Sequence, residues 1–141
     1  MEIRRLKPTD SQKVIEMVKT FRTDTSNPGA AERFLQNDSN YIVACIEAER
    51  IVGFVLGYRL QRYDGQDDMI YIYEVSVLEE YRQRGIGKKM INELIGICKE
   101  NKILKIFLIT NKSNKPAVCL YESTGAKASH DDDIVYWYNM L

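Results

Sequence analysis

The stretch YRQRGIGKKM, residues 81–90, carries four cationic side chains and two glycines. It follows a strand-like run, MIYIYEVSV at residues 69–77, and it precedes residues with helical periodicity. Glycines before a helix let several backbone N–H groups point the same way, and the helix dipole adds positive charge there, so a phosphate is favoured. Cations are unfavourable at a helix N-terminus, which indicates an anion site rather than a solvated helix start.

Two familiar nucleotide-binding motifs do not match this stretch. A Walker loop requires a glycine where Arg82 stands and a Ser or Thr where Lys89 stands. A dinucleotide-binding fingerprint requires a third glycine where Met90 stands. The phosphate-bearing ligand must therefore be identified from the surrounding sequence.

The residues after the glycines predict a helix, a strand and a second helix. Apolar residues recur every fourth position from Ile86 to Cys98, which predicts an amphipathic helix of about four turns. ILKIFLIT at residues 103–110 is typical of a buried strand, so the order strand, helix, strand predicts a right-handed crossover and a parallel pair. A short helix from Asn114, which suits an N-cap, ends at Gly125.

The remaining chain predicts further strands and two N-terminal helices. We expect strands at residues 2–6, 41–48, 51–60 and 134–141, a helix opened by residues 8–10, a break at 23–29 and a short helix at 30–36. The fold class is therefore α/β (α+β), with a mixed, mostly antiparallel sheet of six to seven strands flanked by about four helices. Residues 1–141 are expected to form one domain.

Composition excludes several function classes. Lys plus Arg and Asp plus Glu are both 20, so no general affinity for nucleic acid or anionic membrane is expected. The start MEIRRLKPTD has no apolar leader, which predicts a cytoplasmic protein. Cys45, Cys98 and Cys119 form no CxxC pair and His130 is the only histidine, so we expect reduced core thiols and no metal site.

Two segments carry a family resemblance that covers nearly the whole chain. Residues 82–87 match the pattern Arg/Gln-x-x-Gly-x-Gly/Ala between a strand and a helix, and NKPAVCLYESTGA at 114–126 matches Asn-x-x-Ala, Leu-Tyr and a glycine. The chain resembles the GCN5-related N-acetyltransferase (GNAT) superfamily. The resemblance implies that acetyl-CoA is the co-substrate. The implied coenzyme-binding residues are Val75, Ser76, Val77, Arg82, Gln83, Arg84, Gly85, Ile86, Gly87, Lys88, Asn114 and Ala117.

The resemblance also implies a bulge in the strand before the glycines. The pantetheine arm would lie in the gap that the bulge opens and would pair with the backbone of Val75 and Val77. One unpaired amide there could stabilise the oxyanion formed during attack on the thioester.

Two side chains are candidates for proton transfer. Glu74 would take the proton of the attacking amine, directly or through a water, and partial burial could raise its pKa; the alternative is a carboxylate that merely faces outward. The resemblance implies that Tyr121, the tyrosine of the Leu-Tyr pair, would donate a proton to the leaving thiolate, and the alternative is a core tyrosine. Direct transfer in a ternary complex is the expected mechanism.

The acceptor is predicted less sharply than the coenzyme. IYIYEVSV, RQRGIGKKMINELI and KPAVCLYESTGA look most like aminoglycoside 3-N-acetyltransferases, and the acidic residues at 67–68, 79–80 and 131–133 could receive a polycation or simply be loop residues. A small polyamine, an amino-acid-like metabolite and a protein amine are alternatives. Other classes are a non-catalytic acyl-CoA-binding regulator and an unrelated phosphate-binding module. A homodimer could form through Tyr136, Trp137 and Tyr138.

Overall fold

A computed structural model describes residues 1–22 and 27–140. The helices and strands, in chain order, are β1 (Glu2–Arg5), α1 (Ser11–Arg22), α2 (Ala30–Gln36), β2 (Asn40–Glu47), β3 (Arg50–Leu60), β4 (Met69–Val77), α3 (Ile86–Glu100), β5 (Lys105–Leu108) and α4 (Lys115–Ser123). Short 3₁₀ turns precede α1 (η1, Pro8–Asp10) and follow β4 (η2, Glu79–Tyr81). The predicted α2, β3 and β4 agree with these bounds to within one residue.

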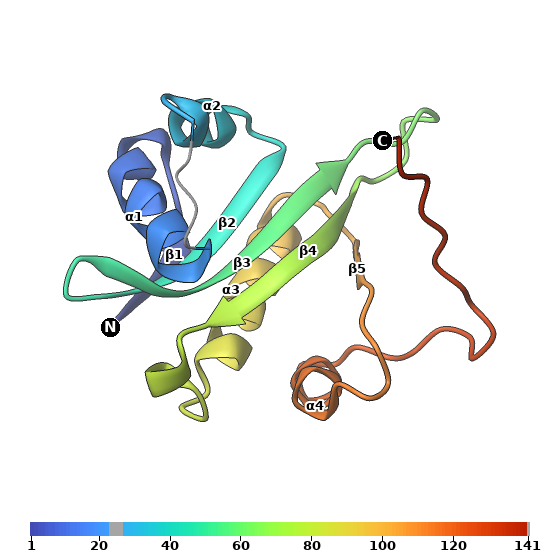
Figure 1. Cartoon of the computed structure of the whole chain (residues 1–141). Coiled ribbons are helices and arrows are strands. Elements are labelled where there is room, and N and C mark those ends of the chain that lie inside the picture. The colour runs from blue at the N-terminus through green and yellow to red at the C-terminus, as the bar shows by residue number, and fades with distance from the viewer. Residues whose placement is uncertain (23–26, 141) are drawn as a thin grey trace.

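The strands form one sheet in the order β1-β2-β3-β4-β5. The first three pairings are antiparallel, and β4 pairs with β5 in parallel. Figure 1 shows α1 and α2 on one face of the sheet and α3 on the other. The predicted mixed, mostly antiparallel sheet is therefore confirmed, as is the parallel pair joined by the α3 crossover.

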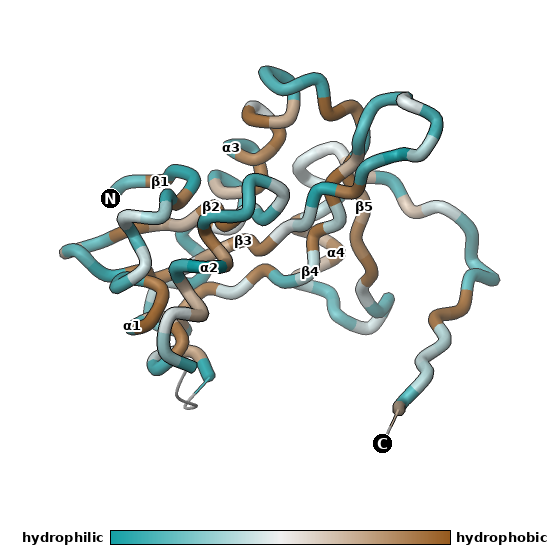
Figure 2. Tube along the Cα trace, turned by 90° about the horizontal axis from the view of Figure 1, so that it is seen from above, coloured by the Kyte–Doolittle hydropathy of each residue, from teal (hydrophilic) through white to brown (hydrophobic). Residues whose placement is uncertain are grey.

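Two apolar layers hold this arrangement together. One lies between the sheet and α3 and includes Ile70, Met90 and Leu94; the other lies under α1 and α2 and includes Val14 and Phe54. Hydrophobic and hydrophilic residues alternate along α3 in Figure 2, as expected for a helix with one buried face. Because both faces of β2 are covered, residues 41–46 are all buried.

The strand expected at residues 134–141 is not formed. Residues 134–140 have no regular structure and Leu141 lies outside the described residues, so the described chain has five strands and not six to seven. The β-branched and aromatic residues from Ile134 to Tyr138 have high strand propensity, but a strand also requires a neighbouring strand for its backbone hydrogen bonds. Among the described residues the segment has no such neighbour.

The structure also differs from the sequence predictions at the ends of some elements and at single residues. β5 is shorter than the predicted 103–110, and residues 23–26 of the expected break lie outside the described residues. Burial raises the pKa of the Cys45 and Cys98 thiols, as expected for core cysteines. Cys119 is exposed, so its prediction as a core thiol was wrong: it lies on the outer side of α4.

Within the described chain, no helix has the length and apolar character needed to cross a bilayer.

A buried carboxylate fixes β1 to the start of α1. Asp10 is 6% exposed and accepts hydrogen bonds from both terminal nitrogens of Arg4 at 2.8 Å. It also accepts from the backbone N–H of Lys7 at 2.7 Å. These donors, the Arg4 guanidinium first, hold the pKa of Asp10 below its ordinary value.

Replacing this carboxylate tests its contribution to stability. Asp10→Asn should lower the free energy of unfolding at pH 7 by about 2 kcal/mol, because charge-assisted hydrogen bonds are lost. The pKa of Asp10 is lower in the folded chain than in the unfolded chain, so its carboxylate stabilises the fold fully above the ordinary pKa of about 4. This contribution to stability is lost as pH falls through the lower pKa of the folded chain. Urea unfolding at several pH values should therefore show the difference from wild type shrinking below about pH 4. Exposed Asp38→Asn is the control; an equal effect there would contradict this account.

Candidate active site

β4 separates from β5 halfway along its length. Their pairing runs from Met69 opposite Lys105 to Ile72 opposite Leu108 and stops there. Leu78 N–H donates to the Val52 carbonyl, so the backbone N–H and C=O groups of Leu78 point toward β3. The direction of these groups alternates from one residue to the next along a strand. The backbone groups of Val75 and Val77 therefore point away from β3, toward the gap. Arg82 Nε donates to the Val77 carbonyl at 3.0 Å. Beyond Ile72 this edge of β4 therefore pairs with no strand of the described chain, as the family resemblance implied, although the Val77 carbonyl accepts from Arg82.

A β-bulge lies at the start of this open edge. Ile72 is opposite Gly57 and Glu74 is opposite Leu56 in β3, so Tyr73 is an extra residue in β4. The bulge reverses the alternation: Ile72 and Val75 both pack toward α3, and Glu74 lies on the other face. The sequence carries a signal for this, because the aliphatic residues at 70 and 72 resume at 75 and 77, one residue out of phase.

The start of α3 leaves backbone amides available beside the gap. Gly85 is the N-cap with φ 76°, a left-handed conformation that glycine adopts at little cost. The hydrogen bond from Lys89 N–H to the Gly85 carbonyl is the first of the helix, so the three preceding amides have no helical partner. The side chains of Arg82, Gln83, Arg84 and Lys88 are exposed. Ile86 instead buries its side chain in the core and can contribute only its backbone.

The second half of α4 lies close to the first turn of α3, where Leu120 faces Gly87. A Cβ on Gly87 would meet the Leu120 side chain at 3.2 Å, so glycine at this position allows the two helices to approach. Asn114 caps α4 as predicted, because its side-chain oxygen accepts from Ala117 N–H at 3.3 Å. Tyr121 is half-buried against the core under α3, and this burial raises the pKa of its hydroxyl.

Glu74 lies among partners that sequence reasoning missed. Arg22 donates to its Oε1 at 2.5 Å, and Ser76 Oγ donates to its Oε2 at 3.1 Å. The side chain is 20% exposed and borders a mostly apolar cavity of about 270 Å³ under α1 and α2, which Arg22 and Phe34 also line. No signal in the sequence links Arg22 to Glu74, because 52 residues separate them. Ser76, expected to contact the coenzyme, orients the carboxylate.

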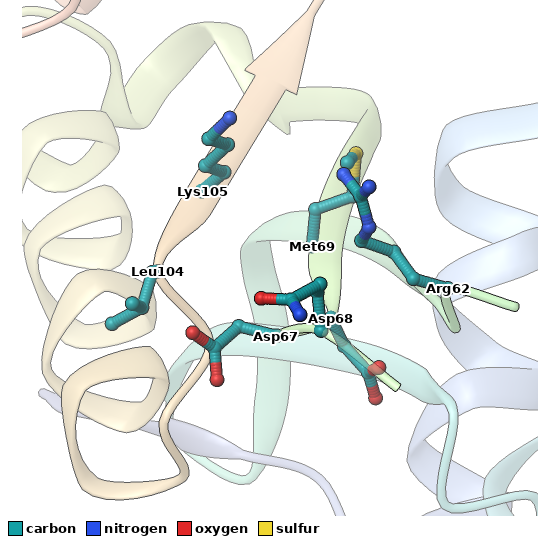
Figure 3. A pocket seen from close by; sticks show the side chains of 7 residues that line it. Arg62, Asp67, Asp68, Met69, Leu104 and Lys105 are labelled. Atoms are coloured by element: carbon teal, nitrogen blue, oxygen red, sulfur yellow. The ribbon is translucent and has the colours of Figure 1, made fainter. Parts of the chain in front are cut away.

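The acidic residues expected to receive a polycation do not gather at Glu74. Asp67 and Asp68 precede β4, where Figure 3 shows them with Arg62 and Lys105 around a separate cavity of about 230 Å³. Asp68 is paired with Arg59 at 2.7 Å. The acids at 79–80 follow the opposite end of β4, and Asp131 pairs with Lys112 at 3.0 Å. They are therefore separate loop acids.

The left-handed N-cap gives a stability test with a matched control. A Cβ would meet open space at both Gly85 and Gly96, but only Gly85 has positive φ. Gly85→Ala should lower the free energy of unfolding by about 1 kcal/mol, because a Cβ strains the left-handed backbone. Gly96→Ala, within α3, should raise it by roughly 0.5–1 kcal/mol. Chemical denaturation measures both, and a change of the same sign would contradict the assigned backbone geometry.

Structures with known activities share this fold. An aminoglycoside acetyltransferase from an uncultured soil metagenomic sample, meta-AAC0020, solved with sisomicin, superposes with a TM-score of 0.84 at 24% identity, covering 99% of this chain and 95% of that one. Aminoglycoside N-acetyltransferase AAC(6')-Iy in complex with CoA superposes with a TM-score of 0.75 at 17% identity, covering 99% and 95%. At these identities the likeness establishes the fold alone.

Curated relatives extend the similarity to sequence. A probable N-acetyltransferase, camello, of Xenopus tropicalis is 31% identical over 72% of this chain and 50% of its own length. The L-2,4-diaminobutyric acid acetyltransferase of Halalkalibacterium halodurans is 27% identical over 82% and 61%. The chain thus spans less than two thirds of either relative. Residues 11–126 match the model of the acetyltransferase (GNAT) family. The chain therefore belongs to the acetyltransferase (GNAT) family.

Proposed function

We propose that this chain transfers the acetyl group of acetyl-CoA to a primary amine by direct attack within a ternary complex. The observation that carries the proposal is the gap between β4 and β5, which opens beside the unbonded first-turn amides of α3. Glu74 lies on one face of the sheet at this gap, and Tyr121 packs against the core on the other face. An amine and a thioester could therefore meet from opposite sides.

The residues around the gap fit the parts of the coenzyme. The amides at the start of α3, together with Arg82, Arg84 and Lys88, suit the diphosphate, because helix N-termini and cations both favour phosphate. The outward backbone groups of Val75 and Val77 suit an amide-bearing arm that adds to β4 as a strand would. Bound acetyl-CoA would supply an acetyl group activated as a thioester.

Glu74 would accept the proton that a primary ammonium must lose before attack. Its carboxylate is held by Ser76 and Arg22 at the edge of the apolar cavity, which fixes the direction of both oxygens. Arg22 occupies Oε1, so the incoming amine must approach Oε2, displace Arg22 or deliver its proton through a water. An N–H of Val75 or Val77 could donate to the carbonyl oxygen as negative charge develops there.

Tyr121 would return a proton to the departing sulfur. Burial raises the pKa of its hydroxyl, so the group stays protonated at neutral pH and can donate. Tyr121 follows Leu120, which lies against the first turn of α3, so the same helix carries the hydroxyl beside the proposed diphosphate site.

The cavity beside Glu74 bears on the acceptor. Its mostly apolar lining and single carboxylate suit a primary amine on a compact, partly apolar body. An aminoglycoside or another polyamine is one acceptor class, supported by the enzymes that share the fold. An amino-acid-like amine is a second, because Arg22 lines the same cavity and could bind a carboxylate, and a diaminobutyric acid acetyltransferase is among the relatives. A protein N-terminus is a third, supported by an N-terminal acetyltransferase relative.

Coenzyme binding should appear as thermal stabilisation. Acetyl-CoA at 100 times its Kd should stabilise the folded chain by about 2.7 kcal/mol, whereas ATP and NAD at equal concentrations should give much smaller shifts. A thermal-shift assay measures all three. Equal shifts would favour a general phosphate-binding module, and no shift with acetyl-CoA would refute coenzyme binding.

Turnover separates an enzyme from a regulatory acyl-CoA binder. Glu74→Gln should lower kcat/KM roughly 100-fold or more, because general-base catalysis is lost, while acetyl-CoA binding by calorimetry stays within about twofold. Thiol release against a panel of aminoglycosides, diamines, amino acids and peptides measures the rate. Glu93→Gln, exposed on α3, is the matched control and should behave as wild type. Wild type that binds acetyl-CoA but acetylates no amine would indicate the regulatory binder.

A further inference from the structure

Arg22 and Glu74 are in direct contact where both line the cavity under α1 and α2. Arg22, the last residue of α1, donates from Nη2 to Glu74 Oε1 at 2.5 Å. Ser76 Oγ donates to Oε2 at 3.1 Å, so both oxygens of the proposed base already have a donor. An amine must come within hydrogen-bond reach of a base to lose its proton. The contact between Arg22 and Glu74 therefore has to change before Oε1 can act.

The charges that line this cavity are balanced and adjacent. Of the described residues in the lining, Arg22 is the only cation and Glu74 the only anion, and the others are apolar, among them Met17, Phe34 and Leu56. An acceptor with several ammonium groups and no anion would find one carboxylate and would face the like charge of Arg22. An acceptor with one ammonium and one carboxylate would find an opposite charge for each. The lining thus favours a zwitterion over a polycation.

The closeness of the two groups indicates how such an acceptor carries its charges. Because the guanidinium and the carboxylate touch, the complementary ammonium and carboxylate must also lie close together, as they do on the single α-carbon of an amino acid. The cavity of about 270 Å³ is smaller than pockets for drug-sized ligands, which measure roughly 300–1,000 Å³. Its apolar lining would cover a hydrocarbon side chain.

We propose that the acceptor is an α-amino acid with an apolar side chain and that Arg22 selects it. The carboxylate of the acceptor draws Arg22 away from Glu74 Oε1, and the ammonium of the acceptor takes the place of Arg22 there. One ion pair becomes two, whereas an amine without a carboxylate only replaces one pair by another. The carboxylate of the acceptor thus frees the base. This inference rests on the proposed acetyl transfer.

The exchange of partners also fits the steps of the reaction. Glu74 takes one proton from the ammonium, the nitrogen bonds to the acetyl carbon and releases a second proton to solvent, and the C–S bond breaks. Its electron pair stays on sulfur, which takes a proton from Tyr121. The products are CoA and an N-acetyl amino acid, whose amide nitrogen is neutral. Once Glu74 has passed its proton to solvent and Tyr121 has regained one, Glu74 can pair with Arg22 again.

Apolar amino acids and their amides test the role of the acceptor's carboxylate. Leucine, methionine and phenylalanine are each compared with the corresponding amide, which lacks only the negative charge. With wild type, kcat/KM for the best amino acid should exceed that for its amide roughly 10- to 100-fold, because a charge-assisted contact is lost. Arg22 is 57% exposed, so we expect the lower part of this range. The amide has the less basic amine and would react faster otherwise, so amides that react as fast as the acids would overturn the inference and leave acetyl transfer supported.

Substitution of Arg22 should change the preference and not only the rate. Arg22→Met should lower kcat/KM for the amino acid about tenfold or more and leave that for the amide unchanged or higher, because Arg22 no longer occupies Oε1. Arg22→Lys keeps the charge without the planar fork and should restore part of the preference. Lys19→Met removes an exposed cation one turn earlier on α1 and should behave as wild type. An equal loss for acid and amide in Arg22→Met would indicate a merely structural role and overturn the inference.

Binding separates failure of this inference from failure of acetyl transfer. Calorimetry with protein saturated with CoA should show that the amino acids bind more tightly than their amides, and that Arg22→Met weakens the acids about tenfold. Such binding without turnover would refute the proposed reaction and keep the acceptor site. If none of the three amino acids binds to wild type, the inference is overturned, and acetylation of another amine by the same protein would show that the reaction stands without it.

Discussion

The separation of β4 from β5 after Ile72 is the constraint on which the candidate site depends. β4 does not fray there, because its other edge stays paired with β3 as far as Val77 opposite Gly53. A strand held on one side and free on the other presents backbone groups at fixed positions. Such groups are stable in solvent and can bind a strand-like ligand with little reorganisation. The candidate site is thus a strand edge that the fold leaves without a neighbouring strand, and not a pocket between loops.

The bulge at Tyr73 connects this gap to the chemistry. Strict alternation from Ile72 would direct Glu74 toward the apolar layer under α3, where an unpaired carboxylate is costly. The extra residue moves Glu74 to the face under α1 and α2, where Arg22 and Ser76 bind it. Val75 and Val77 then resume core packing. One inserted residue therefore keeps the core apolar, aims the acid at a cavity and starts the open edge.

The sequence predicted the features that depend on local pattern. Strands β2 to β4 are runs rich in aliphatic and aromatic residues, helix α3 repeats its apolar residues every fourth position, and Asn114 and Gly85 stand where caps are required. Features set by distant residues were not predictable. The Arg22–Glu74 pair joins elements far apart in the chain, and the exposure of Cys119 depends on how α4 lies on α3. The strand expected at 134–141 was wrong for a related reason: propensity describes one segment, whereas a strand requires two.

β5 lies at the edge of the sheet, beside the gap. All four of its residues pair with β4, so the gap begins where β5 ends, and β5 is held by these four pairs alone. A short strand paired on one side alone is weakly fixed. The partial pairing that opens the gap therefore also leaves the neighbouring strand weakly fixed.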